Sequence, residues 1–377
     1  MQTLNYNNHN YHLQRYPTTD DQSLRAWSNA EILATNYLFE QQLQSSQIVL
    51  CNDRFGVWNC LLNGQTHQQN NGFKQIKTVV TYTSQQKAIT QNLLANNLND
   101  TIDVISPLET LKNVEVALIK VPKSLELFEL FLAQVHKGAT ADTQVICCFM
   151  TKYFANSLLK IAACYFDEIE QSQAWKKARL LILKKPKSHV DYGSFINQIT
   201  FNQTNYQQYF GVFSADKIDI GTQFLLQQFD GINLMVKNKE NKILDLACGN
   251  GVIAKTLSAQ NPNAEFTLTD DFNLAVESAK LNLAGINAKY LWDDSLDKIE
   301  NDYFDLVVSN PPFHFEHENN IEVSLGLFKQ VRRVLKNGGR FILVANKHLS
   351  YDTHLLPIFK QVHLVAYNKK FAVYECS

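Results

Sequence analysis

The stretch 242–251, KILDLACGNG, decides the fold of the C-terminal half of the chain. Residues 242–247 form a short apolar run, which is typical of a buried strand. The glycines at 249 and 251 permit a tight turn, and the apolar segment 252–259 is predicted to be a helix. Strand, turn and helix in this order indicate an α/β unit built on a parallel sheet.

Alternating strands and helices continue after this unit. We predict helices at 272–283 and 321–335, the second stopped by Asn337-Gly338-Gly339, and strands at 264–270, 288–292, 304–309, 340–345, 361–367 and 370–375. The last two strands form a hairpin around Asn368-Lys369. The pattern predicts a largely parallel sheet with helices on both faces.

The N-terminal half repeats this order in a blurred form. We predict strands at 48–51, 78–82, 116–119, 143–150 and 178–183, a turn at 52–56 and a helix at 84–98. We infer an internal duplication of one α/β unit, with domains at 1–190 and 200–377 and a linker near 185–205. Two unrelated α/β domains are the alternative.

Composition excludes several classes of protein. The 377 residues fit about two domains, and the net charge of −1 argues against a surface coated in positive charge, although a local basic face remains compatible with it. The seven cysteines include no C-x-x-C pair, which indicates free thiols in a reducing cytosol and no zinc site. A polar start, and no apolar run of about 18 residues, predict a cytoplasmic protein without signal peptide or membrane span.

The glycine turn is followed by an acid at the end of the second predicted strand. Asp270 lies about 20 residues further on, a spacing that fits a carboxylate holding a ribose hydroxyl pair. The alternative is a tight strand–helix turn without a ligand. The third glycine of dinucleotide-binding loops is missing, and Asp245-x-x-Cys248-Gly249-x-Gly251 instead resembles the first motif of class I S-adenosylmethionine (SAM)-dependent methyltransferases.

This resemblance implies a SAM cofactor and assigns roles by position. The loop would pass the amino-acid end of SAM, the acid of the second strand would hold the ribose, and a residue after the third strand would meet the adenine. The implied cofactor-binding residues are Asp245, Gly249, Gly251, Asp270 and Asp293 or Asp294. Two positions depart from the family: Ala247 stands where glycine is frequent, and Asp293-Asp294 stands where a neutral Asn is frequent.

The stretch 309–317, SNPPFHFEH, follows the fourth predicted strand of this half. It resembles the N-P-P-F/Y loop of methyltransferases that act on planar amino nitrogens. The nitrogen of such an amine is a poor nucleophile because its lone pair is shared with a π-system. We expect the Asn310 side-chain oxygen and the Pro311 carbonyl to accept its N–H groups, and Phe313 to stack on the base.

Plainer interpretations compete at this loop. Asn310 could cap the strand end, and Phe313 could be a core aromatic. His314 and His317 could in principle bind metal, but the only possible third ligands nearby are Glu316 and Glu318, and we expect no metal. We expect Pro312 and His314 to belong to a polar substrate-binding loop.

The C-terminal half resembles the bacterial ribosomal RNA guanine-N2 methyltransferases of both subunits, on the residues 212–221, 245–253 and 310–314. The N-terminal stretches 13–17, 117–123 and 174–180 resemble the large-subunit (23S) members of that family, the RlmG-like enzymes, and the resemblance covers about 13–373. It implies SAM-dependent methylation of a guanine N2 amine in 23S ribosomal RNA. It also implies two tandem Rossmann-like methyltransferase domains, the N-terminal one degenerate.

The first copy lacks the chemistry of a methyl-transfer site. Its turn carries bulky Arg54-Phe55, and its second strand ends at 81–84 without a carboxylate. We expect basic side chains of this copy to position RNA through phosphates, with a solvated surface as the alternative. The residues concerned are Lys120, Lys123, Lys176 and Lys177, together with Arg179, Lys184, Lys185 and Lys187.

Other functions remain open at this point. They are a small-subunit ribosomal RNA methyltransferase, a protein glutamine-amide methyltransferase, a DNA adenine enzyme, and an RNA-binding chaperone that keeps a vestigial methyltransferase fold. The degenerate N-terminal copy and its lysines argue against the glutamine enzyme. The intact set of Asp245, Gly249, Gly251, Asp270 and Asn310 argues against the chaperone.

Overall fold

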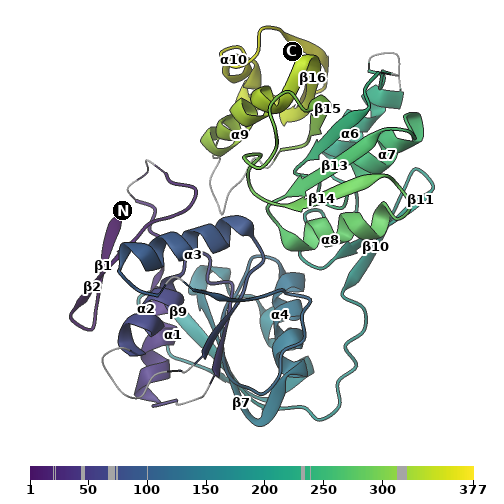
Figure 1. Cartoon of the computed structure of the whole chain (residues 1–377). Helices are drawn as coiled ribbons and strands as arrows, with labels where there is room; N and C mark the ends of the chain where they lie inside the picture. The colour runs from purple at the N-terminus through teal and green to yellow at the C-terminus, as the bar shows by residue number, and fades with distance from the viewer. Residues whose placement is uncertain are drawn as a thin grey trace. The chain divides into compact units, whose positions relative to one another are not determined.

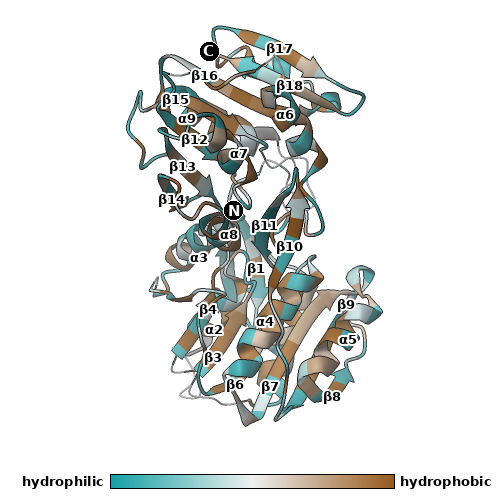
Figure 2. Ribbon diagram, turned by 90° about the vertical axis from the view of Figure 1, so that its right-hand side faces the viewer, coloured by the Kyte–Doolittle hydropathy of each residue, from teal (hydrophilic) through white to brown (hydrophobic). Residues whose placement is uncertain are grey.

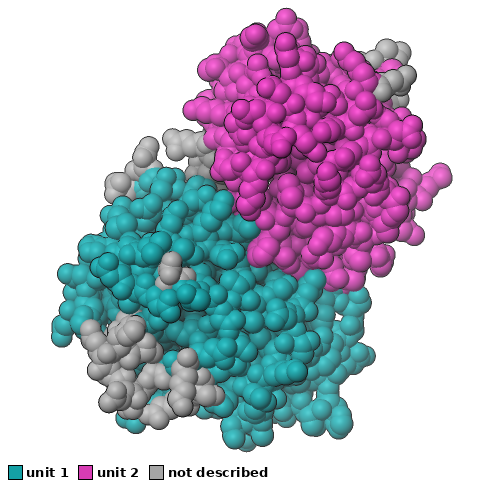
Figure 3. All heavy atoms as spheres, in the orientation of Figure 1, with its two compact units in different colours: residues 1–195 teal, residues 196–377 magenta. Residues whose placement is uncertain are grey.

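The computed structural model describes residues 1–19, 21, 23–43, 47–66, 73, 75–99, 101–230, 234–237, 239–311 and 321–377. The chain divides into two compact units, Met1–Phe195 and Ile196–Ser377 (Figures 1 and 3).

The first unit is built on a seven-stranded sheet with the order β5-β4-β3-β6-β7-β9-β8. The strands of the whole unit are β1 (Gln2–Tyr6), β2 (His9–Leu13), β3 (Gln47–Cys51), β4 (Gln75–Val79), β5 (Asp103–Ile105), β6 (Val114–Lys120), β7 (Ala139–Met150), β8 (Phe166–Gln171) and β9 (Ala178–Pro186). Its helices are α1 (Asn29–Glu40), α2 (Val57–Thr66), α3 (Thr83–Ala95), α4 (Leu125–Lys137) and α5 (Asn156–Tyr165), with a 3-10 turn, η1, at Thr151–Tyr153. The strands β1 and β2 pair as a separate hairpin.

The second unit has a seven-stranded sheet with the order β14-β13-β12-β15-β16-β18-β17. Its strands are β10 (Ile196–Phe201), β11 (Thr204–Tyr209), β12 (Lys242–Leu246), β13 (Glu265–Asp270), β14 (Ala288–Trp292), β15 (Phe304–Ser309), β16 (Leu335–Asn346), β17 (Val362–Tyr367) and β18 (Phe371–Cys376). Its helices are α6 (Ile220–Asp230), α7 (Val252–Gln260), α8 (Asn273–Asn282), α9 (Ile321–Val334) and α10 (Tyr351–Leu355), with a 3-10 turn, η2, at Lys347–Leu349.

The two sheets share one topology. In each, five parallel strands are completed by an antiparallel hairpin at one edge, β8–β9 in the first unit and β17–β18 in the second. The prediction of two tandem Rossmann-like domains is confirmed. The duplication extends to an irregularity that unrelated folds would have no reason to share.

That irregularity is a register shift between the fourth and fifth parallel strands. The paired residues before and after it are Val114↔Ala139 and Val116↔Gln144 in the first unit, and Phe304↔Leu335 and Leu306↔Arg340 in the second. In both units the fifth parallel strand therefore contains extra residues near its start, in β7 of the first unit and in β16 of the second. In the second unit it contains 337–339, which we expected to be a stop between helix and strand but which lies inside β16.

Helices cover both faces of the second sheet, so both faces are buried. Successive residues of each strand point to opposite faces and therefore enter different cores. Ile243 of β12 packs in a core formed with α6, α7 and α8, whereas the next residue, Leu244, packs in a core formed with α9 and α10. Hydrophobic residues accordingly follow one another along strands of both sheets, such as β3 and β16 (Figure 2). This is the arrangement that the continuous apolar runs of the sequence predict.

Several elements were not predicted from the sequence. The hairpins β1–β2 and β10–β11 and the helices α1 and α6 had no assignment, and neither had the edge strands β5 and β8. The linker expected near 185–205 contains β10, and only 187–195 separates it from β9. Polar, Asn- and Gln-rich strands such as β11 (TNYQQY) lack the apolar alternation that identifies a strand.

A buried ion pair joins the start of β12 to β16. The Arg340 guanidinium donates to both carboxylate oxygens of Glu240, at 2.8 and 3.0 Å, and to the Met235 carbonyl at 2.8 Å. Both side chains are almost inaccessible, at 7% and 4% exposed. The pair therefore fixes the segment that leads into the strand carrying the glycine loop.

We expect Glu240→Ala to lower the free energy of unfolding of the second unit by about 3–5 kcal/mol, because it leaves a buried guanidinium without its main partner. Hydrogen–deuterium exchange of β12 and β16 measures this loss, with β3 of the first unit as internal reference. Lys289→Ala, which breaks the exposed pair with Glu265, is the matched control and should change exchange little. Equal protection in the Glu240 variant and the wild type would contradict the assigned role.

Candidate active site

The glycine loop after β12 is shaped by three residues with positive φ: Ala247 at 57°, Gly249 at 53° and Gly251 at 77°. At Gly251 a Cβ atom would lie 2.5 Å from Leu283 Cδ1 and 3.1 Å from Ala279 Cβ, so α8 requires a glycine there. At Gly249 a Cβ would meet no atom within 4 Å. Gly251 thus serves packing, and Gly249 leaves space on the open side of the loop.

Asp245 lies beneath this loop and is buried. Its Oδ2 accepts the amide hydrogen of Ala254 at 2.9 Å, whereas its Oδ1 is buried and has no hydrogen-bond partner among the described residues. Burial, with a smaller contribution from the charge of Asp270, raises the pKa of Asp245 to about 8. A buried acceptor left unsatisfied at a loop of this kind fits a ligand that brings its own donor, such as the ammonium group of SAM.

Asp270 ends β13 and is tied to the loop. Its Oδ2 accepts the Gly249 amide hydrogen at 3.0 Å, and its Oδ1 accepts that of Phe272 at 2.9 Å. Burial raises the pKa of this carboxyl to about 6. Each carboxylate oxygen has a second lone pair, so a pair of ribose hydroxyls can still be accepted.

Asp293 and Asp294 follow β14 at the same edge of the sheet. The Asp293 amide donates to the Asp270 carbonyl at 3.1 Å, which places the two loops side by side. The Asp293 carboxylate is engaged in its own turn, where it accepts from Ser295 and pairs with Lys298 at 2.7 Å. Asp294 is half-buried in the same turn.

Asn310 follows β15 with its amide group held on one side. Its Nδ2 donates to Asp219 Oδ2 at 3.0 Å and to Thr222 Oγ1 at 2.8 Å. Because a carboxylate can only accept, the amide nitrogen must face Asp219 and the Asn310 oxygen is turned the other way. The side chain therefore presents a pre-oriented acceptor.

Asp219 is itself fixed at the start of α6. Its Oδ2 accepts the amide hydrogens of Gly221 at 2.8 Å and Thr222 at 3.2 Å. The sequence interpretation used 212–221 only as a mark of family resemblance and did not identify Asp219 or Thr222 as parts of the site. The available signal was an Asp followed by a glycine and a threonine at a helix start, which is typical of an N-cap.

Parallel pairing brings these residues to one edge of the sheet. Leu246 of β12 is opposite Thr269 of β13 on one side and Ser309 of β15 on the other, and the Ser309 hydroxyl donates to the Leu246 carbonyl at 2.7 Å. The glycine loop, Asp270 and Asn310 are therefore the next residues of three adjacent strands. Pro311 is buried directly after Asn310, whereas Pro312, Phe313 and His314 lie outside the described residues.

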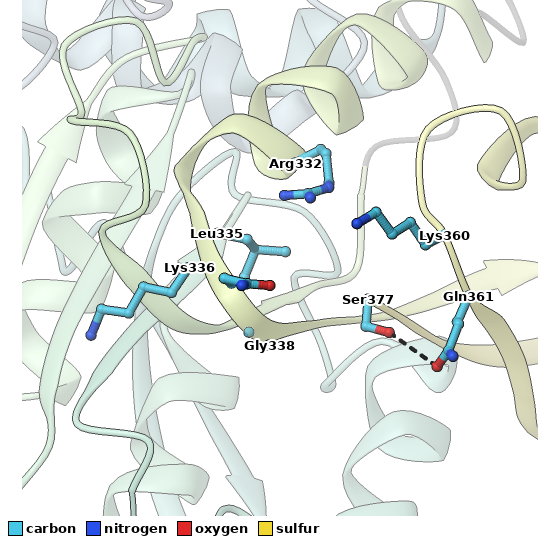
Figure 4. A pocket seen from close by; sticks show the side chains of 9 residues that line it. Arg332, Leu335, Lys336, Gly338, Lys360, Gln361 and Ser377 are labelled. Carbon is cyan, nitrogen blue, oxygen red and sulfur yellow. Dashed lines mark hydrogen bonds between the residues drawn. The ribbon is translucent and has the colours of Figure 1, made fainter.

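A separate surface hollow of about 200 Å³ lies at the start of β16 (Figure 4). It is lined by Arg332, Leu335, Lys336, Asn337, Gly338, Gly339, Lys360, Gln361 and Ser377. Since β15 and β16 are parallel, this hollow is at the edge of the sheet opposite Asn310 and does not belong to the site. Within the described ranges, no three His, Cys, Asp or Glu side chains gather to hold a metal ion, and no helix is long and apolar enough to cross a membrane.

The corresponding loop of the first unit is filled by protein. Asn52 and Gly56 have positive φ, as Ala247 and Gly251 do, but Arg54 occupies the place of Gly249. The buried Arg54 donates to Ser84 Oγ at 2.7 Å, and its guanidinium carbon lies 4.9 Å from the centre of the Tyr82 ring. A side chain thus takes the space that the second unit leaves open.

The lysines of the first unit that were predicted to bind phosphates fall into two groups. Lys120 pairs with the buried Glu31 at 2.8 Å, and Lys184, Lys185 and Lys187 pair with Glu170, Glu168 and Asp167 across the β8–β9 hairpin. The charge of this group is therefore balanced within the protein. Lys123, Lys176 and Lys177 are exposed, the last two in the turn that precedes β9.

Comparison with known proteins matches the chain in two parts. The family described as "RLMG N-terminal domain" matches residues 1–188, and that described as "Methyltransferase small domain" matches residues 203–375. The ribosomal RNA large subunit methyltransferase G of Vibrio vulnificus is 30% identical over 380 residues, covering 97% of this chain and 96% of its own. The protein of the same name from Psychromonas ingrahamii is 29% identical, covering 96% and 95%.

Among solved structures, the T. thermophilus 16S rRNA N2 G1207 methyltransferase (RsmC), in complex with AdoMet and guanosine, has a TM-score of 0.75. The match covers 100% of this chain and 97% of that one at 18% identity, which shows a common fold. Fold, glycine loop and strand-end acid define a class I SAM-dependent methyltransferase. Within that class, the chain belongs to the ribosomal RNA large subunit methyltransferase G family.

We expect the affinity for SAM to fall as the pH drops through about 6. Asp270, with its pKa raised to about 6, is ionised at pH 7.5 and becomes protonated below pH 6, which removes an acceptor for the ribose. The dissociation constant should rise by up to about tenfold per pH unit. Calorimetric titration of the full chain with SAM from pH 5 to 8 measures it.

Asp270→Asn should bind SAM more weakly and without this pH dependence. A second rise in affinity, as the pH increases through about 8, belongs to Asp245, because its ionised carboxylate binds the ammonium group better. In the variant this rise should persist but be centred at a lower pH, because the charge of Asp270 no longer raises the pKa of Asp245. A wild-type affinity that stays constant between pH 5 and 7 would show that Asp270 does not hold the ligand.

Proposed function

We propose that this protein transfers a methyl group from SAM to the exocyclic N2 amine of a specific guanine in 23S ribosomal RNA. The observation that carries the proposal is the fixed orientation of Asn310, whose amide nitrogen is held by Asp219 and Thr222, so that its oxygen is turned away from them as an acceptor. The named relatives act on large-subunit ribosomal RNA, and they match the chain over nearly its whole length. We propose a cytoplasmic location, where ribosomal RNA is made in bacteria.

The chemistry follows from what the acceptors do to an amine. The Asn310 oxygen and the Pro311 carbonyl accept the two N–H groups of N2 and hold the amine so that its lone pair points away from the ring plane. Bound SAM supplies a methyl group on a positively charged sulfur. The nitrogen forms the new N–C bond as the C–S bond breaks onto sulfur, and the amine then loses one proton to solvent. The two acceptors stabilise the positive charge that develops on the nitrogen.

We assign the parts of SAM to residues at the ends of β12, β13 and β14. We assign the amino-acid end of SAM to Asp245, Gly249 and Gly251, on the basis of the unsatisfied Asp245 Oδ1 and the open space at Gly249. We assign the ribose to Asp270 and the adenine to the turn at Asp293-Asp294.

The substrate roles fall on two parts of the chain. A guanine inside a helix is out of reach of the site, so the target must be unpaired or turned out of its stack. We propose that Phe313 stacks on this base and that Pro312 and His314 line its pocket. In the degenerate unit, Lys123, Lys176 and Lys177 are exposed and suited to phosphates, whereas Lys120 would first have to leave Glu31.

The substrate is tested by incubating the protein with labelled SAM and with 23S RNA, 16S RNA, release factor or DNA in parallel. We expect label in 23S RNA, recovered as N2-methylguanosine after digestion and mass spectrometry. Label in 16S RNA alone would assign the small-subunit reaction, and label in the release factor alone would assign a glutamine amide. Absence of transfer to every substrate, with RNA still bound, would assign an RNA-binding chaperone.

We expect Asn310→Ala to lower kcat by about 100-fold, because it removes an acceptor for the developing charge. Thr222→Val removes one of the two groups that hold the Asn310 amide and should lower kcat by about tenfold, whereas Thr222→Ser keeps the hydroxyl and should stay near wild type. Single-turnover methylation of 23S RNA at saturating SAM measures kcat in each variant.

SAM affinity is the control and should be unchanged in all three variants. In the Asn310→Ala background, Thr222→Val should have no further effect, because its role passes through the Asn310 amide. Additive losses in the double variant would show that Thr222 acts by another route.

A further inference from the structure

An exposed cluster of cationic and aromatic side chains lies at the end of β16 in the second unit. We call it the lysine edge, and it consists of Lys347, His348, Tyr367, Lys369 and Lys370. The Lys347 amide donates to the Lys370 carbonyl at 2.8 Å, which joins η2 to the β17–β18 turn. Lys347 Nζ lies 4.4 Å from the centre of the Tyr367 ring, and Tyr367 is 62% exposed.

The lysine edge lies at the same end of the parallel strands as Asn310, their carboxyl end. Ser309 of β15 is paired with Leu343 of β16, and β16 continues to Asn346 before η2 begins. With strands about 4.8 Å apart and about 3.3 Å of rise per residue, Lys347 is on the order of 10 Å from Asn310. A nucleotide that flanks a base at Asn310 is therefore within reach of this cluster.

The corresponding turns of the first unit, at the end of β7, also carry pairs of a lysine and an aromatic ring. The Thr151 amide donates to the Lys177 carbonyl at 2.8 Å, which is the counterpart of the Lys347–Lys370 bond. Lys176 Nζ lies 4.6 Å from the Trp175 ring, and Lys152 Nζ lies 4.6 Å from the Tyr153 ring. This unit has lost the open cofactor loop, so SAM binding does not account for the cations and aromatic rings that both copies carry here.

The charge of the lysine edge is available to a partner. Among the residues that the structure describes, no carboxylate forms an ion pair with Lys347, Lys369 or Lys370. The hairpin lysines of the first unit, in contrast, each face a carboxylate. Cations that pair with no described carboxylate and lie beside an exposed aromatic ring suit a phosphate backbone whose bases can stack, as in single-stranded RNA.

We propose that the lysine edge binds the single-stranded nucleotides that flank the target guanine. Lys347, Lys369 and Lys370 contact their phosphates, and Tyr367 stacks on one base. The proposal rests on the proposed function for the identity of the RNA. It assigns substrate binding to the catalytic unit itself, in addition to the lysines of the degenerate unit.

The test compares the full-length wild type with Lys347→Ala/Lys370→Ala, Tyr367→Ala and Tyr367→Phe. Fluorescence anisotropy with a labelled single-stranded RNA carrying the target segment measures affinity as a function of salt, and methylation assays give KM and kcat. Losing two phosphate contacts should flatten the slope of log K against log [salt] by about 1.4 and weaken binding by about tenfold or more. Tyr367→Ala should weaken binding by about tenfold, and Tyr367→Phe should not, because the ring remains.

Lys289→Ala is the matched control, because it removes an exposed lysine far along the sheet that is paired with Glu265. SAM affinity and kcat at saturating RNA should stay at wild-type values in every variant. An unchanged salt slope and KM in the double lysine variant would overturn the proposal, as would equal losses in the Lys289 control. The binding assay needs no methyl transfer, so a wild type that binds this RNA without methylating it would refute the proposed function alone.

Discussion

The site depends on the parallel pairing of β12 with β13 on one side and with β15 on the other. Parallel neighbours end at the same edge, so three loops that are distant in sequence meet there. The glycine loop, Asp270 and Asn310 are then joined by short hydrogen bonds from Gly249 and Ser309. The buried Arg340–Glu240 pair ties the segment that precedes β12 to β16.

The sequence was sufficient to place the proposed site residues at the ends of neighbouring strands. The positions of the loop glycines, Asp270 and the Asn310-Pro311 pair could be predicted because strand, turn and acid follow one another along the chain, and their roles stay predictions. Asp219 and Thr222 could not, because they contact Asn310 across the fold, and only the tertiary structure shows that they orient its amide. The balanced charge of Lys184, Lys185 and Lys187 was hidden for the same reason, since their acids lie on the neighbouring strand β8.

The two units show which parts of the fold are structural and which are chemical. The register shift is present in both copies. So are the glycines before α2 and α7, where an added Cβ atom would lie too close to Ile89 in the first unit and to Leu283 in the second. The open position in the loop and the strand-end carboxylate are present only in the second copy. The degenerate unit therefore separates the requirements of folding from those of methyl transfer within one chain.

Arg54 has a consequence for the history of the first copy. Replacing it with glycine would reopen the loop, but the residue after Val79, which corresponds to Asp270, is Val80 and offers no carboxylate. Ser84 and Tyr82 would also lose the guanidinium that they now hold. A single reversal at either position would therefore leave the first unit without the other feature, and the reversal at Arg54 would also remove the contacts that its guanidinium makes with Ser84 and Tyr82.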